Sequence, residues 1–232
     1  MTRFANQLAQ AKQQLSEYTF VELVYQGSRT IVYRAVESVT QQPVVIKILA
    51  QEYPTFSELV QFRNQYTVAK NLPIVGFIRH LQLLHCGNGY ALVMEDFGGI
   101  SLSQYYQHHS LTIREILDIA IQLADICHEL YQHRVIHKDI KPANILIHPK
   151  SKQVKLIDFS LASLLPKETQ VLQSPKHLEG TLAYLAPEQT GRMNRGLDYR
   201  ADFYALGVTL YQLLTGQLPF TSKILWNCSI AI

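Results

Sequence analysis

The sequence contains few cysteines, and none of them has the spacing of a metal site. Its three cysteines, Cys86, Cys127 and Cys228, lie far apart and include no C-x-x-C pair. This odd, scattered set predicts thiols in a reducing compartment and argues against a disulfide framework or a zinc site. A chain of 232 residues is long enough to bury a core without such cross-links.

Runs of one charge sign and long apolar runs are also missing. The net charge is only +3 and no Lys/Arg-rich run occurs, so nothing in the sequence indicates nucleic-acid binding. No stretch approaches the ~20 apolar residues of a membrane span, and the N-terminus lacks the apolar segment of a signal peptide. These absences predict a cytoplasmic protein without nucleic-acid or membrane partners.

The first part of the chain mixes β-branched and aromatic residues with turn residues, which is typical of a small antiparallel sheet. The expected elements are strands 18–25, 31–37 and 43–49, a helix 55–71, and strands 78–85 and 90–95. Gly87-Asn88-Gly89 is a tight-turn sequence between the last two strands. Residues 3–15 are rich in Ala, Gln, Leu and Lys and predict a helical extension over 1–17.

After Gly98-Gly99 the apolar residues recur with helical spacing. The expected elements are a helix 111–134, short strands 145–147 and 154–157, and a helix 199–214. Thr112 and Glu115 form a capping box at the start of the first helix. Together, the two parts predict an α+β fold with a five-stranded antiparallel lobe and a mainly helical lobe.

The strongest local pattern is the segment 135–146, with the sequence VIHKDIKPANIL. It resembles the catalytic loop H-R-D-x-x-x-x-N of protein kinases. The resemblance implies that Asp139 orients and deprotonates the attacking hydroxyl, that Lys141 reaches the transferred phosphoryl group, and that Asn144 holds magnesium. A Lys two residues after the Asp is typical of the Ser/Thr branch of this family.

Two further segments match the phosphate-binding parts of the family in the right order. Asp158 follows Asn144 by fourteen residues, and its segment Ile157–Ser160 resembles the D-F-G motif, whose Asp binds magnesium. Val44-Val45-Ile46-Lys47 resembles the strand whose Lys holds the α- and β-phosphates of ATP. The cofactors that this resemblance implies are ATP and Mg²⁺.

Residues 92–97 resemble the hinge that joins the two lobes of a kinase. Met94 matches the gatekeeper position, and the backbone groups of Glu95 and Phe97 are implied as contacts of the adenine ring. The resemblance therefore extends the expected ATP contacts from the phosphates to the base.

Residues 180–195, with the sequence GTLAYLAPEQTGRMNR, resemble the end of a kinase activation segment. They are especially similar to the kinase module at the front of large cyanobacterial sensor histidine kinases. The resemblance implies that Thr181 packs at the active site, beside Asp139 and Lys141. It also implies that Asp202, early in the last expected helix, supports the backbone of the catalytic loop.

Several positions depart from the family pattern. Gly27 is the only glycine left at the three glycine positions of the phosphate-covering loop. Gln65, 18 residues after Lys47, stands where a Glu is expected. Ser160 replaces the Gly of D-F-G, and Lys138 replaces the Arg of the catalytic loop. A neutral partner should position Lys47 less firmly than a charged one would.

The resemblance covers roughly residues 18–220 and implies two lobes, 18–97 and 98–220. The tail 221–232 is off-pattern, so the helical lobe is expected to lack its last helices. Residues 201–214 are apolar nearly all round, which is typical of a helix buried on every side. Without covering helices, an exposed apolar face and self-association through it are expected.

The predicted function is a protein serine/threonine kinase that transfers the γ-phosphoryl group of ATP to a protein substrate. The intact set of Asp139, Asn144 and Asp158 favours this activity. Gln65 and Ser160 leave open a pseudokinase-like nucleotide-binding or interaction module, or an inactive truncated kinase. A small-molecule phosphotransferase is a further alternative, which the Ala-Pro-Glu segment at 186–188 disfavours.

Overall fold

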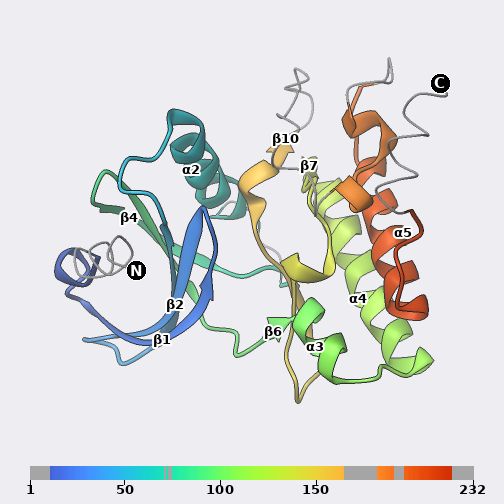
Figure 1. Cartoon of the computed structure of the whole chain (residues 1–232), viewed down its shortest axis with the longest axis horizontal. Helices are drawn as coiled ribbons and strands as arrows, with labels where there is room; N and C mark the ends of the chain where they lie inside the picture. Colours follow the sequence, from blue (N-terminus) through green and yellow to red (C-terminus); the bar gives the residue numbers. More distant parts are fainter. Residues whose placement is uncertain (1–10, 71, 73–74, 165–181, 191–195, 221–232) are drawn as a thin grey trace. The chain divides into compact units, whose positions relative to one another are not determined.

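The computed structural model describes residues 11–70, 72, 75–164, 182–190 and 196–220 (Figure 1). Most of the expected N-terminal extension, Gly180-Thr181 and the tail 221–232 lie outside these residues, although residues 11–14 are helical. The chain divides into two compact units. Unit 1 comprises residues 1–73 and 78–98, and unit 2 comprises residues 74–77 and 99–232.

Unit 1 is built on the predicted five-stranded antiparallel sheet. Its strands are β1 (Tyr18–Gln26), β2 (Thr30–Glu37), β3 (Pro43–Leu49), β4 (His80–Cys86) and β5 (Gly89–Glu95). They lie in the order β1-β2-β3-β5-β4. Ile31, Tyr33 and Ala35 of β2 are buried, because alternate residues of a strand face the same side of the sheet.

The predicted helix of unit 1 is α2 (Phe56–Lys70), which contacts β4 and β5. It buries Phe62, Gln65, Val68 and Ala69. Residues three or four apart lie on one face of a helix, so Gln65 is placed among the buried side chains although it is polar.

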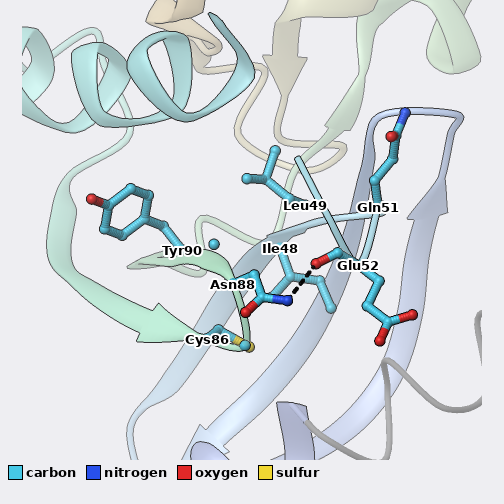
Figure 2. Close-up of a pocket in the computed structure, with 9 residues that line it drawn as sticks. Ile48, Leu49, Gln51, Glu52, Cys86, Asn88 and Tyr90 are labelled. Atoms are coloured by element: carbon cyan, nitrogen blue, oxygen red, sulfur yellow. Dashed lines mark hydrogen bonds between the residues drawn. The ribbon is translucent and has the colours of Figure 1, made fainter. Parts of the chain in front are cut away.

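The β4–β5 hairpin turns on Gly87 and Asn88, because Cys86 pairs with Gly89. Gly87 has a φ of 58°, in the left-handed region that tight hairpin turns require. The tight turn predicted from the sequence is therefore confirmed. Asn88 Nδ2 donates a hydrogen bond of 3.1 Å to the carbonyl oxygen of Glu52 beside a small pocket at this end of the sheet (Figure 2).

Unit 2 is mainly helical. Its helices are α3 (Leu102–His108), α4 (Ile113–Gln132) and α5 (Arg200–Thr215), and its strands are β6 (Ile100–Ser101), β7 (Val135–Ile136), β8 (Ile145–Ile147), β9 (Val154–Leu156) and β10 (Ser163–Leu164). Strands β6, β8 and β9 form one small sheet, and β7 pairs with β10. Helix α3 was not predicted, because its seven residues are too few for a clear apolar period.

Helix α4 begins at the predicted capping box. The Thr112 side chain accepts the N–H of Glu115, and the Glu115 side chain accepts the N–H of Thr112. This satisfies two of the backbone donors that the first turn of a helix leaves without an intrahelical partner. Helix α4 buries an apolar face and runs beside α5 (Figure 1).

Both long helices of unit 2 also expose apolar side chains. Helix α5 buries Leu206 and Leu213 but exposes Phe203, Tyr211 and Leu214. The exposed apolar side chains of α4 are Ile113, Leu117 and Ile121. The exposed apolar face expected on the helix 201–214 is thus observed among the described residues, at Phe203, Tyr211 and Leu214. No helix among the described residues is long and apolar enough to cross a membrane.

Candidate active site

The segment between β7 and β8 is fixed by one buried carboxylate. Asp202, near the start of α5, accepts the backbone N–H of His137 on Oδ2 at 2.7 Å and that of Lys138 on Oδ1 at 2.8 Å. Only 3% of Asp202 is exposed. Burial raises the pKa of Asp202, while the two N–H donors favour its charged form. The support that the sequence predicted for Asp202 is therefore observed.

Lys138 lies in the left-handed region, with a φ of 70°. A residue other than glycine pays of order 1–3 kcal/mol for such a conformation unless its surroundings hold it there. Asp202 provides part of that support through the N–H of Lys138. The strained residue directly precedes Asp139, so its conformation decides where the Asp139 side chain lies.

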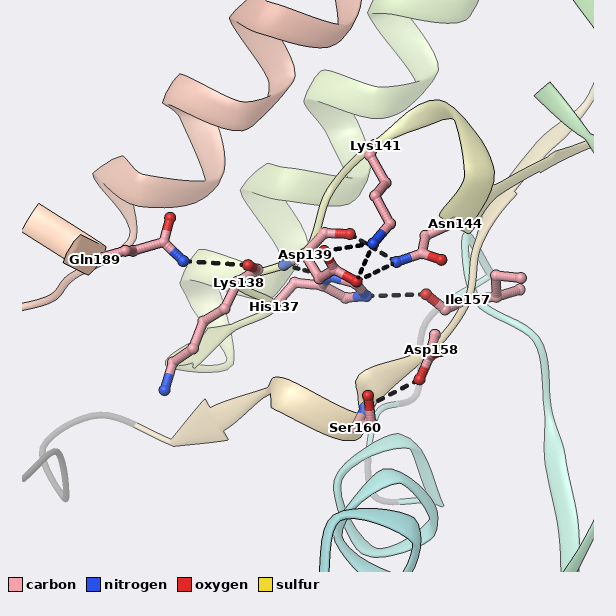
Figure 3. Close-up of polar contacts among 9 residues, drawn as sticks. All are labelled: His137, Lys138, Asp139, Lys141, Asn144, Ile157, Asp158, Ser160 and Gln189. Atoms are coloured by element: carbon pink, nitrogen blue, oxygen red, sulfur yellow. Dashed lines mark hydrogen bonds and ion pairs between the residues drawn. The ribbon is translucent and has the colours of Figure 1, made fainter. Parts of the chain in front are cut away.

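His137 is fully buried and adopts a defined tautomer. Its Nδ1 accepts the backbone N–H of Asp139 at 3.3 Å, and its Nε2 lies 3.0 Å from the carbonyl oxygen of Ile157 (Figure 3). A carbonyl oxygen only accepts, so Nε2 carries the proton and the ring is neutral. Burial lowers the pKa of His137 and favours the same state. The ring links the catalytic loop to the segment before Asp158.

Asp139, Lys141 and Asn144, the three residues that the sequence singled out in this loop, contact one another in the structure. Lys141 Nζ lies 2.8 Å from both carboxylate oxygens of Asp139. Asn144 Nδ2 donates to Asp139 Oδ2 at 2.7 Å and to the Asp139 carbonyl oxygen at 2.9 Å (Figure 3). Burial raises the pKa of Asp139, and the adjacent Lys141 charge opposes this shift. The Nδ2 group of Asn144 thus donates to Asp139. The other polar atom of this amide, Oδ1, is the acceptor atom of the Asn144 side chain.

Asp158 is the second non-glycine residue of the site in the left-handed region, with a φ of 69°. Its Oδ1 accepts the backbone N–H of Ser160 at 3.3 Å and caps the short 3-10 turn η2 (Phe159–Leu161). Ser160 itself does not have a positive φ. The replacement of Gly by Ser160 therefore adds no backbone strain in this conformation.

Phe159, between Asp158 and Ser160, is completely buried. Its ring packs edge-on against Phe77 at a centroid distance of 5.1 Å and against His137 at 4.9 Å. These contacts anchor the chain on the C-terminal side of Asp158, while the carbonyl of Ile157 anchors it on the other side.

Lys47 lies in β3 of unit 1 and is 8% exposed. Its Nζ donates to Gln65 Oε1 in α2 at 3.0 Å, which confirms the register predicted from the spacing of 18 residues. Lys47 Nζ also lies 6.0 Å from the ring centroid of Phe62, a cation–π contact that was not predicted. The three-residue spacing of Phe62 and Gln65 could have revealed it, because both face the same side of α2.

The other residues expected to bind the nucleotide in unit 1 are Gly27, Met94, Glu95 and Phe97. The N–H of Gly27 closes the β1–β2 loop on the Thr30 carbonyl oxygen at 2.9 Å. A Cβ at Gly27 would lie within 3.0 Å of the Tyr25 ring, so a side chain there would require the Tyr25 ring to move. Met94 is buried within β5, Glu95 ends this strand, and Phe97 is half-buried.

Gln189 is a site residue to which the sequence analysis gave no role. It lies in the 3-10 turn η5 (Pro187–Thr190) and donates Nε2 to the Lys138 carbonyl oxygen at 3.1 Å (Figure 3). Its Oε1 accepts the N–H of Ala186 at 2.9 Å. The sequence carries no signal for this contact beyond the position of Gln189 after Ala-Pro-Glu.

The oxygen donors of unit 2 fit a magnesium ion. Asn144 supplies an amide oxygen and Asp158 a carboxylate, the hard ligands that Mg²⁺ prefers, and Mg²⁺ commonly takes only one or two protein ligands beside phosphate oxygens and water. Among the described residues, no group of three His, Cys, Asp or Glu side chains could hold a metal alone.

Comparisons with known proteins identify the family of this chain. A family model described as "Protein kinase domain" matches residues 18–228, which include part of the tail 221–232. Serine/threonine-protein kinase PrkC of Bacillus subtilis is 31% identical over 209 residues, covering 89% of this chain and 31% of the relative. Serine/threonine-protein kinase PknB of Mycolicibacterium smegmatis is 31% identical over 218 residues, covering 90% and 34%.

A third relative is Serine/threonine-protein kinase A of Synechocystis, 32% identical over 221 residues, with 88% of this chain and 41% of the relative covered. The chain thus spans between 31% and 41% of the length of these three relatives. The predicted α+β kinase fold, with its five-stranded antiparallel sheet, is confirmed. The chain belongs to the protein kinase family.

Proposed function

We propose that this chain is a protein serine/threonine kinase that uses ATP and Mg²⁺. The observation that carries the proposal is the Asp139 carboxylate, held by Lys141 Nζ at 2.8 Å and by Asn144 Nδ2 at 2.7 Å. The relatives named as serine/threonine-protein kinases support the choice of a protein hydroxyl as the acceptor.

In the proposed reaction, Asp139 accepts a hydrogen bond from a Ser or Thr hydroxyl and takes its proton. The hydroxyl oxygen forms a bond to the γ-phosphorus as the bond between this phosphorus and the β–γ bridging oxygen breaks, and ADP leaves with that bond's electron pair. Burial raises the pKa of Asp139, and the ion pair with Lys141 opposes this shift by favouring the ionised form that accepts the proton. Lys141 also lies close enough to Asp139 to offset negative charge on the transferred phosphoryl group.

Asn144 Oδ1 and the Asp158 carboxylate are proposed as the magnesium ligands. When bound, Mg²⁺ would neutralise the charge that develops on the phosphate oxygens of ATP. Lys47 is proposed to bind the α- and β-phosphates, and the loop at Gly27 to offer backbone N–H groups to them. Backbone groups at Glu95 and Phe97, next to Met94, are proposed to bind the adenine.

The alternative of a binding module without activity is favoured by one observation. Lys47 Nζ donates to the neutral amide of Gln65 in α2, at the position where a Glu was expected. The Lys47 ammonium bonds a neutral amide more weakly than it would bond a carboxylate of opposite charge, so phosphate positioning would be weaker but not lost. The complete Asp139–Lys141–Asn144 contact set makes the active enzyme the better proposal.

Asp139→Asn should lower kcat for phosphoryl transfer by at least about 100-fold, because the amide cannot take the hydroxyl proton. ATP affinity, measured by calorimetry with Mg²⁺, should stay nearly unchanged. Asp118→Asn is the matched control, since Asp118 is exposed on α4 and loses the same charge. An equal loss of affinity and turnover in Asp139→Asn would contradict the assigned role.

The proposed role of Asp158 as a magnesium ligand is tested by the same calorimetric measurement of ATP affinity. Asp158→Ala should remove most of the dependence of ATP affinity on Mg²⁺, because a carboxylate ligand of the ion is lost. Wild-type affinity that is the same with Mg²⁺ and with chelator would count against the proposed metal site.

Gln65→Glu should raise kcat/KM roughly fivefold, because a carboxylate would bind the Lys47 ammonium more strongly than the present neutral amide does, by about 1 kcal/mol. Steady-state kinetics at varied ATP measures the change. Gln51→Glu, on an exposed residue of the same unit, introduces the same charge and should leave the rate unaltered. No gain, or a fall, in Gln65→Glu would mean that a neutral partner already positions Lys47 fully.

We also infer that the chain self-associates through the exposed apolar face of its helical lobe, at α5. The exposed apolar side chains of this helix are Phe203, Tyr211 and Leu214, with exposures of 43% or more. Light scattering should give a mass that rises with protein concentration, and Leu214→Lys should reduce this rise. Val39→Lys, at a surface residue of unit 1, is the control. A wild-type mass that stays monomeric over the whole range would refute the inference.

A further inference from the structure

The peptide unit between Lys138 and Asp139 is held at both of its polar atoms. Its N–H, from Asp139, donates to His137 Nδ1 at 3.3 Å. Its carbonyl oxygen, from Lys138, accepts Gln189 Nε2 at 3.1 Å. Rotation of this peptide plane would move the Asp139 side chain, so the two contacts together restrict where the carboxylate lies.

The contact of Gln189 joins segments that are far apart in the sequence. Lys138 and Gln189 are separated by 51 residues, and Gln189 lies in the turn that follows Ala186. The same side chain accepts the N–H of Ala186 at 2.9 Å, and the backbone N–H of Gln189 donates to the Ala186 carbonyl oxygen at 2.9 Å. The amide group is thereby fixed at its own turn and offers its N–H to the catalytic loop.

The side chain at position 189 must accept a hydrogen bond from the Ala186 N–H and also donate one to the Lys138 carbonyl oxygen. A glutamine does both. A glutamate of the same length could still accept the Ala186 N–H, but it has no proton to donate to the Lys138 carbonyl oxygen when ionised. The two functions of Gln189 can therefore be separated by a single substitution.

We propose that Gln189 is a positioning residue, which fixes the Lys138–Asp139 peptide and through it the Asp139 carboxylate. Gln189 acts from the carbonyl side of the strained Lys138, while Asp202 acts on the N–H side. The turn that follows Ala186 is thereby coupled to the geometry of the reacting groups. The expected effect of Gln189 on turnover rests on the proposed kinase function. Its expected effect on the structure of the loop does not.

The test compares Gln189→Met, Gln189→Glu and the control Gln107→Glu, whose residue is exposed on α3. Hydrogen exchange is followed in fragments that cover residues 137–145. Both Gln189 variants should exchange about fivefold faster there, which corresponds to the loss of roughly one hydrogen bond. The control should match the wild type. In kinetic assays kcat should fall at least about fivefold, with KM for ATP within about twofold of the wild type.

Gln189→Glu distinguishes a role of Gln189 in positioning Asp139 from a role confined to its own turn. If it behaves as the wild type does while Gln189→Met exchanges faster, the side chain only closes its own turn and the proposal is overturned. Unchanged exchange in both variants, or faster exchange with unaltered kcat, also overturns it. If the wild type shows no phosphoryl transfer, the proposed function fails, and the exchange data alone then decide on Gln189. Because Gln189→Glu keeps the turn contact, it remains informative if Gln189→Met unfolds.

Discussion

The Asp202 carboxylate accepts two consecutive backbone N–H groups, from His137 and Lys138, inside unit 2. A buried carboxylate is costly unless such donors satisfy it, and each donor would be equally costly without its acceptor. The cost of breaking this contact holds Lys138 in the left-handed conformation. The positions of Asp139, Lys141 and Asn144 follow from that backbone path, so the arrangement of the reacting groups depends on one interaction between α5 and the catalytic loop.

The neutral, buried His137 contributes to the site through its hydrogen bonds and takes no part in the proposed reaction. His137 accepts the Asp139 N–H and donates to the Ile157 carbonyl oxygen, so the segment that carries Asp158 is aligned with the segment that carries Asp139. Phe159 packs on the His137 ring and completes this alignment. Two short stretches with little regular structure are thereby rigid enough to hold proposed ligands and a proposed base, which is what catalysis by preorganised groups requires.

Much of this arrangement could be predicted from the sequence, because the motifs are local and their order is informative. The sheet of unit 1, the capped start of α4, the contact of Lys47 with Gln65 and the cluster around Asp139 were all expected and are present. Contacts between distant segments could not be predicted, because nothing in the local sequence around Gln189 specifies the Lys138 carbonyl as its partner. The left-handed conformation of Asp158 was also not predicted, because the sequence indicated a change of backbone freedom at Ser160, which replaces the glycine of the motif.

The most direct test of the account is transfer of label from ATP radiolabelled at the γ-phosphate, with Mg²⁺ and a mixed protein acceptor. Acid hydrolysis of the labelled protein then identifies the modified residue. The arrangement around Asp139 predicts label on serine and threonine, and none when Mg²⁺ is chelated. Tight nucleotide binding without any labelled protein would contradict the account and would assign the chain to the binding modules of its family.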